Sequence, residues 1–203
     1  MREAANDKKD YRRLRTKKYF LDAAKEIIMN EGSENVTVRK VADLAGYSYA
    51  TLYHYFSDLN ELMWEVRKDM VNELVDSLGK KMPGTEDGIE SLREGFRIYI
   101  SYYFKNPNVF RFFYFYPMSK PNKLDEEAEY EPDFGAMWNE AFKGMVLAGR
   151  LNPEDIEAAA KTIIYAIHGM IMLNFSNNGD MTEENVYKDL DKIMEFIFCR
   201  KKE

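Results

Sequence analysis

The segment TVRKVADLAGYSYATLYHYFSDLNEL, residues 37–62, decides how the N-terminal part of this chain folds. Thr37 is a good residue to begin a helix, because its hydroxyl can accept a hydrogen bond from an unpaired backbone N–H of the first turn. One apolar face at helical spacing then contains Val38, Val41, Ala42 and Ala45. Gly46 can adopt the left-handed conformation that often ends a helix, because it lacks a Cβ atom. The pattern predicts a short helix that ends at Gly46.

A second helix is predicted directly after this glycine. Ser48 can cap it, and Leu52 and Phe56 lie one turn apart, so that both face inward. The opposite, outward side carries Tyr49, Ala50, Tyr53 and His54. Asp58 followed by Glu61 resembles the capping box that opens a third helix. Two short helices joined by a glycine turn, the second with small and hydrogen-bonding side chains outside, are typical of a helix-turn-helix.

These residues resemble the DNA-binding signature of the tetracycline-repressor (TetR) family of transcriptional regulators. The positions that carry the resemblance are Thr37, Val41, Ala42, Gly46, Ser48, Leu52, Tyr53, Phe56, Glu61 and Leu62. The match covers about the first third of the chain, and the number of coupled positions makes it specific. The chain departs from the family at Leu59, where the family usually has a Lys that holds a DNA phosphate.

The resemblance implies contacts to a double-stranded DNA operator. It implies that Thr37 and Tyr53 hold phosphates, and that Arg39 and residues 49–51 reach base edges in the major groove. The predicted DNA-binding residues are Thr37, Arg39, Ser48, Tyr49, Ala50, Thr51, Tyr53 and His54. Arg39 is the best candidate for a two-pronged contact to guanine.

The charge distribution fits a protein that touches DNA at one end. Residues 1–56 carry 11 Lys or Arg and 8 Asp or Glu, a net charge of +3, whereas the whole chain of 203 residues carries −6. The basic segment YRRLRTKK, residues 11–18, is either a solvated helix start or an additional contact to DNA phosphates. The only cysteine, Cys199, excludes an internal disulfide and a Cys-based zinc site, which fits a reducing compartment. We also expect no signal peptide, no membrane-spanning segment and a cytoplasmic location.

The rest of the chain is predicted to be all-α. After a polar N-terminal arm over residues 1–11, apolar residues at helical spacing predict helices over residues 16–30, 58–80, 89–105, 109–118, 134–148, 154–175 and 182–198. The aromatic run VFRFFYFYPM, residues 109–118, could also be a buried strand, but the chain offers no partner strand. Residues 119–133 are predicted to be a solvated, mobile loop; their spacing does not suit a calcium site.

No enzyme motif accompanies these helices. The sequence lacks a Gly-x-Ser-x-Gly elbow, a phosphate-binding loop, a His-Glu-x-x-His motif and a dinucleotide-binding glycine pattern, so we expect no enzyme, no cofactor and no metal. His168 lies in a predicted buried helix, where a single histidine is more often a hydrogen-bonded core residue than a ligand contact. Cys199 is interpreted as a packing residue, because no second cysteine can form a disulfide with it.

Aromatic and methionine side chains gather on the C-terminal helices. As single residues they are ordinary core, but the resemblance implies a cavity for a small-molecule effector among these helices, mostly apolar or aromatic in character. The candidate effector-binding residues are Tyr99, Tyr103, Phe110, Phe113, Tyr114, Met137, Trp138, Phe142, His168 and Met172. The last two helices have apolar stripes, and residues 154–175 are apolar on several sides, which indicates a homodimer built around a four-helix bundle.

The sequence therefore predicts a DNA-binding domain over residues 1–57 and a helical effector-binding and dimerisation domain over residues 58–203. The predicted function is a transcriptional regulator, a repressor in the first instance, that binds a palindromic operator as a dimer and is released by its effector. The alternative is a ligand-binding protein of the same fold without specific DNA binding, and Leu59 is the residue that favours it. An enzyme using the cavity has no support from any residue.

Overall fold

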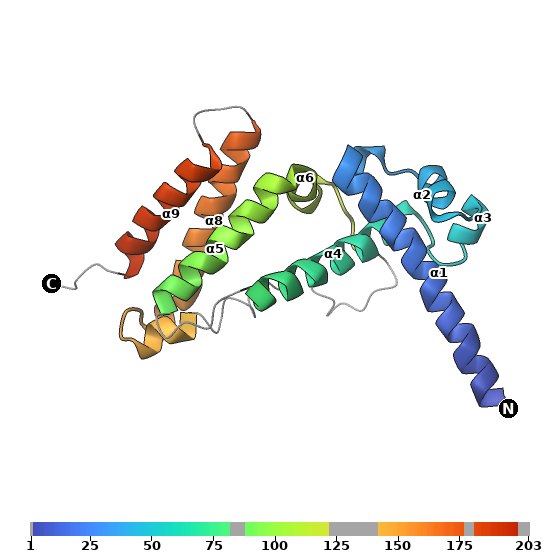
Figure 1. Cartoon of the computed structure of the whole chain (residues 1–203), viewed down its shortest axis with the longest axis horizontal. Helices are drawn as coiled ribbons and strands as arrows, with labels where there is room; N and C mark the ends of the chain where they lie inside the picture. The colour runs from blue at the N-terminus through green and yellow to red at the C-terminus, as the bar shows by residue number, and fades with distance from the viewer. Residues whose placement is uncertain (1, 82–87, 122–141, 177–180, 199–203) are drawn as a thin grey trace. The chain divides into compact units, whose positions relative to one another are not determined.

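The computed structural model describes residues 2–81, 88–121, 142–176 and 181–198. Regular structure in these residues is helical, without a strand, so the all-α prediction is confirmed. The helices, drawn in Figure 1, are α1 (Arg2–Glu31), α2 (Val38–Ala45), α3 (Tyr49–Leu52), α4 (Leu59–Lys81), α5 (Gly88–Lys105), α6 (Pro107–Phe115), α8 (Ile156–Phe175) and α9 (Glu183–Phe198). Two short 3-10 turns are η1 (Ser33–Asn35) and η2 (Pro153–Asp155), and residues 142–147 are also helical.

The chain divides into two compact units, and α4 contributes to both. The first unit contains α1–α3, α4 as far as Glu73, and α6. The second contains α4 from Leu74 onward, α5, residues 142–147, α8 and α9. The predicted division after residue 57 separates a DNA-binding part from an effector-binding part. It is a functional division, different from the packing boundary within α4, and it stays a prediction.

The first unit is built around Phe20 of α1. Its ring is fully buried and lies 5.4 Å from the ring of Tyr47 and 6.4 Å from that of Phe56. Leu52 is also fully buried, which confirms that Leu52 and Phe56 face inward. Burial of such side chains, at about 25 cal/mol per Å² of apolar surface, holds the short helices α2 and α3, which would not be stable alone.

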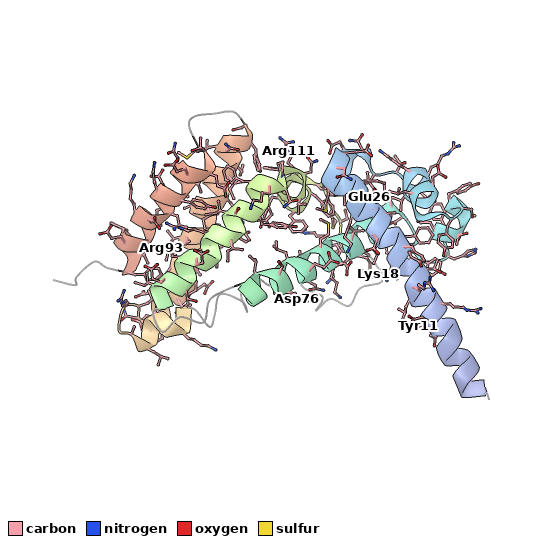
Figure 2. The ribbon with its side chains drawn as sticks, viewed as in Figure 1. Tyr11, Lys18, Glu26, Asp76, Arg93 and Arg111 are labelled. Carbon is pink, nitrogen blue, oxygen red and sulfur yellow. The ribbon has the colours of Figure 1, made fainter. Side chains whose placement is uncertain are left out.

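The second unit is a layer of three helices, α5, α8 and α9, that pack on one another (Figure 1). Its core is formed by Leu92, Phe96, Ile100, Ile163, Ile167, Ile171, Val186, Leu190 and Met194. Asp191 of α9 forms ion pairs with α5, because it lies 2.8 Å from the guanidinium of Arg97 and 3.1 Å from that of Arg93; Figure 2 labels Arg93. Each helix therefore presents a continuous apolar stripe to its neighbours, as the spacing predicted.

Three predicted helix boundaries were wrong. α1 already begins at Arg2, so the residues expected to form a polar arm are its first turns, which extend past α2 and α3 (Figure 1). α3 ends at Leu52 instead of continuing to Phe56; N–H groups of His54 and Tyr55 bond to carbonyls three residues earlier, which tightens the chain into turns. α6 ends at Phe115, and Pro117 explains this, because proline disfavours helical conformation in the residue before it. The helical interpretation of the aromatic run is confirmed.

The segment Pro153–Phe175 corrects a further expectation. It is long and apolar enough to cross a membrane by length and composition, with a mean hydropathy of 1.4, whereas the sequence pattern was taken to contain no such run. One such helix is weak evidence for a membrane span, since a core helix can pass the same test. Only 28% of its most apolar window is buried within the chain, so much of this helix offers apolar surface.

Several predictions lie outside the described residues. These are most of the loop over 119–133, the first part of the helix predicted over 134–148, the effector candidates Met137 and Trp138, and Cys199.

Candidate nucleic-acid interface and effector region

The turn between α2 and α3 is fixed by the caps that the sequence predicted. Thr37 Oγ1 accepts a hydrogen bond from the backbone N–H of Lys40 at 3.2 Å, and Ser48 Oγ accepts one from that of Thr51 at 3.1 Å. Gly46 has a φ of 78°, and the N–H of Tyr47 bonds to the carbonyl of Ala42 at 2.9 Å, which closes the end of α2. These bonds, which use only two side-chain hydroxyls and backbone groups, hold the turn between α2 and α3. The other side chains of α2 and α3 remain available for contact with DNA.

Most of the predicted DNA-binding residues lie on this outer surface. Tyr49 is 62% exposed and Tyr53 is 50% exposed. Thr37, Arg39, Ser48, Ala50 and His54 are exposed as well, and Thr51 is half-buried beneath the Ser48 cap. The guanidinium of Arg39 has no carboxylate partner in the described part of the chain, so its full charge faces solvent. Small and polar side chains at the start of a short helix suit entry into the major groove.

The start of α4 differs from the predicted capping box. The backbone N–H of Glu61 donates to Asp58 Oδ1 at 2.7 Å, as expected. The Glu61 carboxylate accepts from the backbone N–H and hydroxyl of Ser57, both at 2.5 Å. The reciprocal bond therefore reaches one residue further back, which ties the last turn after α3 to the first turn of α4.

A second clamp holds the first turn of α4 within the same unit. The side-chain amide of Asn60 donates to the carbonyl of Ser119 at 2.7 Å and accepts from the N–H of Ser119 at 3.0 Å. The side-chain amide of Asn108, in the first turn of α6, donates to the carbonyl of Met29 near the end of α1 at 3.1 Å. Residues of α6 and of the segment that follows it thus hold α1 and α4. These contacts could not be predicted from the sequence, because the partners are far apart in the chain.

Two groups of cations on α1 have different surroundings. Lys17 lies 3.1 Å from the Glu65 carboxylate and 5.5 Å from the centre of the Phe56 ring, so its charge is directed at α4. Arg12 and Arg13, which follow Tyr11 in the sequence, have no carboxylate partner among the described residues. The basic segment is therefore divided into cations that hold the fold and cations that face solvent.

Lys25 is the most enclosed cation of the first unit. Its ammonium lies 2.5 Å from an Asp69 oxygen, 2.7 Å from a Glu73 oxygen and 3.4 Å from an Asp22 oxygen. Burial alone would lower the pKa of Lys25, but hydrogen bonds to Asp69 and Glu73 raise it above its usual range. Sequence reasoning missed this site, although a lysine on the apolar side of α1 and two acids four residues apart on α4 were the available signal.

The predicted effector residues are divided between the two units. Phe110, Phe113 and Tyr114 belong to α6 in the first unit. Tyr99, Tyr103, Phe142, His168 and Met172 belong to the second, where Met172 is 44% exposed on α8 instead of facing the core. Neither unit alone therefore contains the whole set of predicted effector residues.

Within the second unit, α5 and α8 bring together a polar pair, of which Tyr99 is buried and His168 is half-buried. The hydroxyl of Tyr99 lies 2.8 Å from Nε2 of His168, and the Tyr99 ring packs edge-on against Tyr103 with centres 4.8 Å apart. Phe142 packs separately, with its ring centre 6.2 Å from that of Phe198. Burial lowers the pKa of His168 to about 4, so the imidazole is neutral near pH 7. Its Nε2 can then either donate a hydrogen bond to a hydroxyl group or accept one from it.

A cavity of about 260 Å³ lies between α4 and α5 in the second unit. It is lined by Leu74, Ser77 and Leu78 of α4, by Ile98, Ser101, Tyr102 and Lys105 of α5, and by Asn106 after α5. None of the predicted effector residues lines it, although Tyr102, beside Tyr103, does.

A helix-turn-helix with an exposed polar second helix, followed by a unit of packed helices, is the architecture of a DNA-binding regulator. Residues 20–66 match the family model described as bacterial regulatory proteins, tetR family. The N-terminal segment of this chain is therefore similar to the tetR family of bacterial regulatory proteins, in agreement with the resemblance seen in the sequence.

Curated relatives match the same part of the chain. The HTH-type transcriptional regulator BetI of Klebsiella pneumoniae (strain 342) is 29% identical over 77 residues, which are 38% of this chain and 40% of BetI. The HTH-type nicotine-responsive transcriptional repressor HdnoR of Paenarthrobacter nicotinovorans is 31% identical over 68 residues, 34% of this chain and 35% of HdnoR. The chain thus matches about two fifths or less of the length of these relatives.

Solved structures are similar over nearly the whole chain, at low sequence identity. RolR in complex with resorcinol has a TM-score of 0.66 at 16% identity, covering 92% of this chain and 89% of RolR. A TetR family transcription regulator from Marinobacter aquaeolei VT8 has a TM-score of 0.64 at 18% identity, covering 96% and 97%. Thermus thermophilus FadR, a TetR family repressor in complex with lauroyl-CoA, has a TM-score of 0.64 at 19% identity, covering 92% and 97%. These likenesses establish the fold of both units.

Proposed function

We propose that this protein is a ligand-responsive transcriptional repressor that binds a palindromic operator as a homodimer. The observation that carries the proposal is the exposed surface of α2 and α3, with Arg39, Tyr49 and His54 directed to solvent around a turn fixed by two caps. Thr37 and Tyr53 flank it and can donate hydroxyl hydrogen bonds to phosphates, while Arg39 and residues 49–51 read base edges. The family match at residues 20–66 supports the same assignment.

The homodimer is proposed to form through α8 and α9. α8 exposes Tyr165, Met172 and Leu173, and α9 exposes Phe196, although both helices already pack on α5. A second copy would cover these side chains in a four-helix bundle and would account for the apolar character of Pro153–Phe175 without a membrane. Two recognition helices would then meet half-sites about one helical turn, or a multiple of it, apart. A cytoplasmic location is part of this proposal.

Release by a small molecule is proposed by analogy with the relatives. HdnoR is nicotine-responsive, and the solved structures of RolR and FadR hold resorcinol and lauroyl-CoA. In this chain the second unit supplies a polar pair, Tyr99 and His168, with the aromatic ring of Tyr103 packed against Tyr99, and these side chains suit an apolar or aromatic effector. Binding there would favour a conformation with lower operator affinity.

The competing function is ligand binding by the same fold without specific DNA recognition. It is favoured by one observation, Leu59 at the first position of α4, together with the engagement of nearby Lys17 with Glu65. Leu59 carries no charge, and Lys17 is already paired with Glu65. A DNA phosphate beside the start of α4 would therefore lack the lysine that usually holds it.

One experiment separates the two functions: selection of bound sequences from a random duplex DNA pool, repeated at two salt concentrations. A two-fold symmetric motif enriched at both concentrations is the result expected for the repressor. Weak binding that disappears at higher salt and enriches no motif would mean that the protein holds phosphates without reading bases, and it would overturn the proposal.

A further inference from the structure

The cavity between α4 and α5 is lined by apolar, hydroxyl-bearing and charged side chains. Leu74 and Leu78 of α4, one turn apart, and Ile98 of α5 supply the apolar wall. Ser77, on the same side of α4, and Tyr102 of α5 add hydroxyl groups. Among the described residues that line the cavity, Lys105 in the last turn of α5 is the only charged one.

The ammonium of Lys105 is exposed and is not already neutralised. It makes no ion pair or hydrogen bond with any side chain in the described part of the chain. Its position in the last turn also complements the α5 dipole, which is an ordinary reason for a lysine to stand there. The dipole amounts to only about half a charge. Lys105 therefore leaves net positive charge on the lining of the cavity.

The size of the cavity limits what it can hold. A volume of about 260 Å³ lies just below the range of about 300–1,000 Å³ that is usual for ligand pockets. A one-ring or short-chain molecule is of a size that this volume can hold.

From this combination we propose that the α4–α5 cavity is an effector site for a small carboxylate with an apolar body. The carboxylate pairs with Lys105 and accepts from Ser77, and the apolar body lies on Leu74, Leu78 and Ile98. One lysine presents a compact single charge, which suits a monoanion better than a phosphate with two charges. The proposal rests on the proposed regulator function, because it adds that filling the cavity weakens operator binding.

The binding step is tested by isothermal titration with two carboxylates, benzoate and hexanoate, and with the matched neutral amides, benzamide and hexanamide. At least one carboxylate should bind, at least tenfold more tightly than its amide. Lys105→Met should weaken that carboxylate about tenfold and leave the amide unchanged, as expected for loss of a charge-assisted contact. Lys192→Met is the matched control, because Lys192 is an exposed lysine of α9 away from the cavity, and it should change nothing.

Position and regulation are tested separately. Ser77→Phe should fill the cavity and abolish carboxylate binding, while circular dichroism remains that of the wild type. Saturating carboxylate should lower the affinity for the selected operator at least tenfold in the wild type and not in Lys105→Met. The inference is overturned if neither carboxylate binds, if Lys105→Met binds it equally well, or if bound carboxylate leaves operator affinity unchanged. Failure of the protein to select any operator would instead overturn the proposed function, while the titration would still decide the binding site.

Discussion

The hydroxyl group of Tyr99 lies 2.8 Å from Nε2 of His168, and burial of this pair lowers the pKa of His168 to about 4. In the unfolded chain the imidazole has a pKa of about 6.5, so the unfolded state binds a proton at higher pH than the folded state does. Between pH 6.5 and 4 the protein should therefore lose stability as the pH falls, by up to about 3 kcal/mol.

Changing His168 to Gln should remove most of this acid sensitivity, because Gln can keep a hydrogen bond to Tyr99 without gaining a proton. The measurement is the free energy of unfolding in urea at pH 7 and at pH 4.5 for both proteins. His54→Gln, at an exposed position, is the control and should retain the wild-type slope. Equal slopes for wild type and His168→Gln would contradict the prediction.

Lys25→Met should destabilise the first unit at neutral pH. The change removes the cation that Asp69 and Glu73 share and leaves two carboxylates close together. We expect a loss of about 2 kcal/mol, less than the 3–5 kcal/mol typical of a broken buried pair, because Glu73 is 57% exposed and solvent screens it. Thermal unfolding measures the loss, and Lys18→Met, which removes an exposed pair with Asp22, should cost under about 0.5 kcal/mol.

The contribution of Lys25 to the free energy of unfolding should be lost only at high pH. The pKa of Lys25 is raised in the folded state, so its stabilising contribution is complete below the unfolded value of about 10.4 and is lost as the pH rises above it. The difference between wild type and Lys25→Met should therefore stay constant from pH 7 to 9. A difference that disappears within this range would show that another group is responsible.

Tyr165→Asp should dissociate the proposed homodimer without unfolding the protomer. Tyr165 is 67% exposed on α8, so the substitution costs the isolated chain little, whereas a buried carboxylate at an interface is costly. Sedimentation velocity should show a monomer with unchanged helix content. Tyr11→Asp, the same change at a similarly exposed tyrosine of α1, should remain dimeric, and dissociation of both variants alike would contradict an interface on α8.

The helix-turn-helix could be predicted from the sequence because its determinants are local. The caps at Thr37 and Ser48 and the left-handed Gly46 act within four residues of their partners, and each was found where expected. The end of α3 could not be predicted, because the turns after Leu52 depend on how Phe56 is buried against Phe20.

The effector region was less predictable, for a related reason. Helical spacing identifies apolar stripes but does not say which partner each stripe meets. Phe110 and Tyr99 have the same kind of pattern, yet α6 packs with the first unit and α5 with the second. The cavity was missed because its defining features are a lysine and a serine on two different helices, Lys105 and Ser77, that only packing brings together.

Leu59→Lys should strengthen operator binding if this helix start approaches a phosphate. One additional phosphate contact should make the logarithmic salt dependence of binding steeper by roughly 0.9. Asn72→Lys adds the same charge on α4 about 20 Å further along the helix, at an exposed position, and should leave the slope unchanged. The measurement is fluorescence anisotropy with the selected operator over a range of salt concentrations; equal slopes for both variants would mean that only net charge matters.

Arg39→Ala should weaken binding selectively at one base pair of each operator half-site. The guanidinium of Arg39 is exposed without a carboxylate partner in the described residues, so it is available to pair with two acceptors on guanine. Loss of such a contact removes about 1–3 kcal/mol of discrimination at that position. Tyr53→Phe is the contrasting variant, because loss of a phosphate contact should weaken all operator sequences alike. Affinities for a set of single-base operator variants measure the difference. If Arg39→Ala weakens every sequence by the same factor, Arg39 is a phosphate anchor, and base recognition must come from residues 49–51.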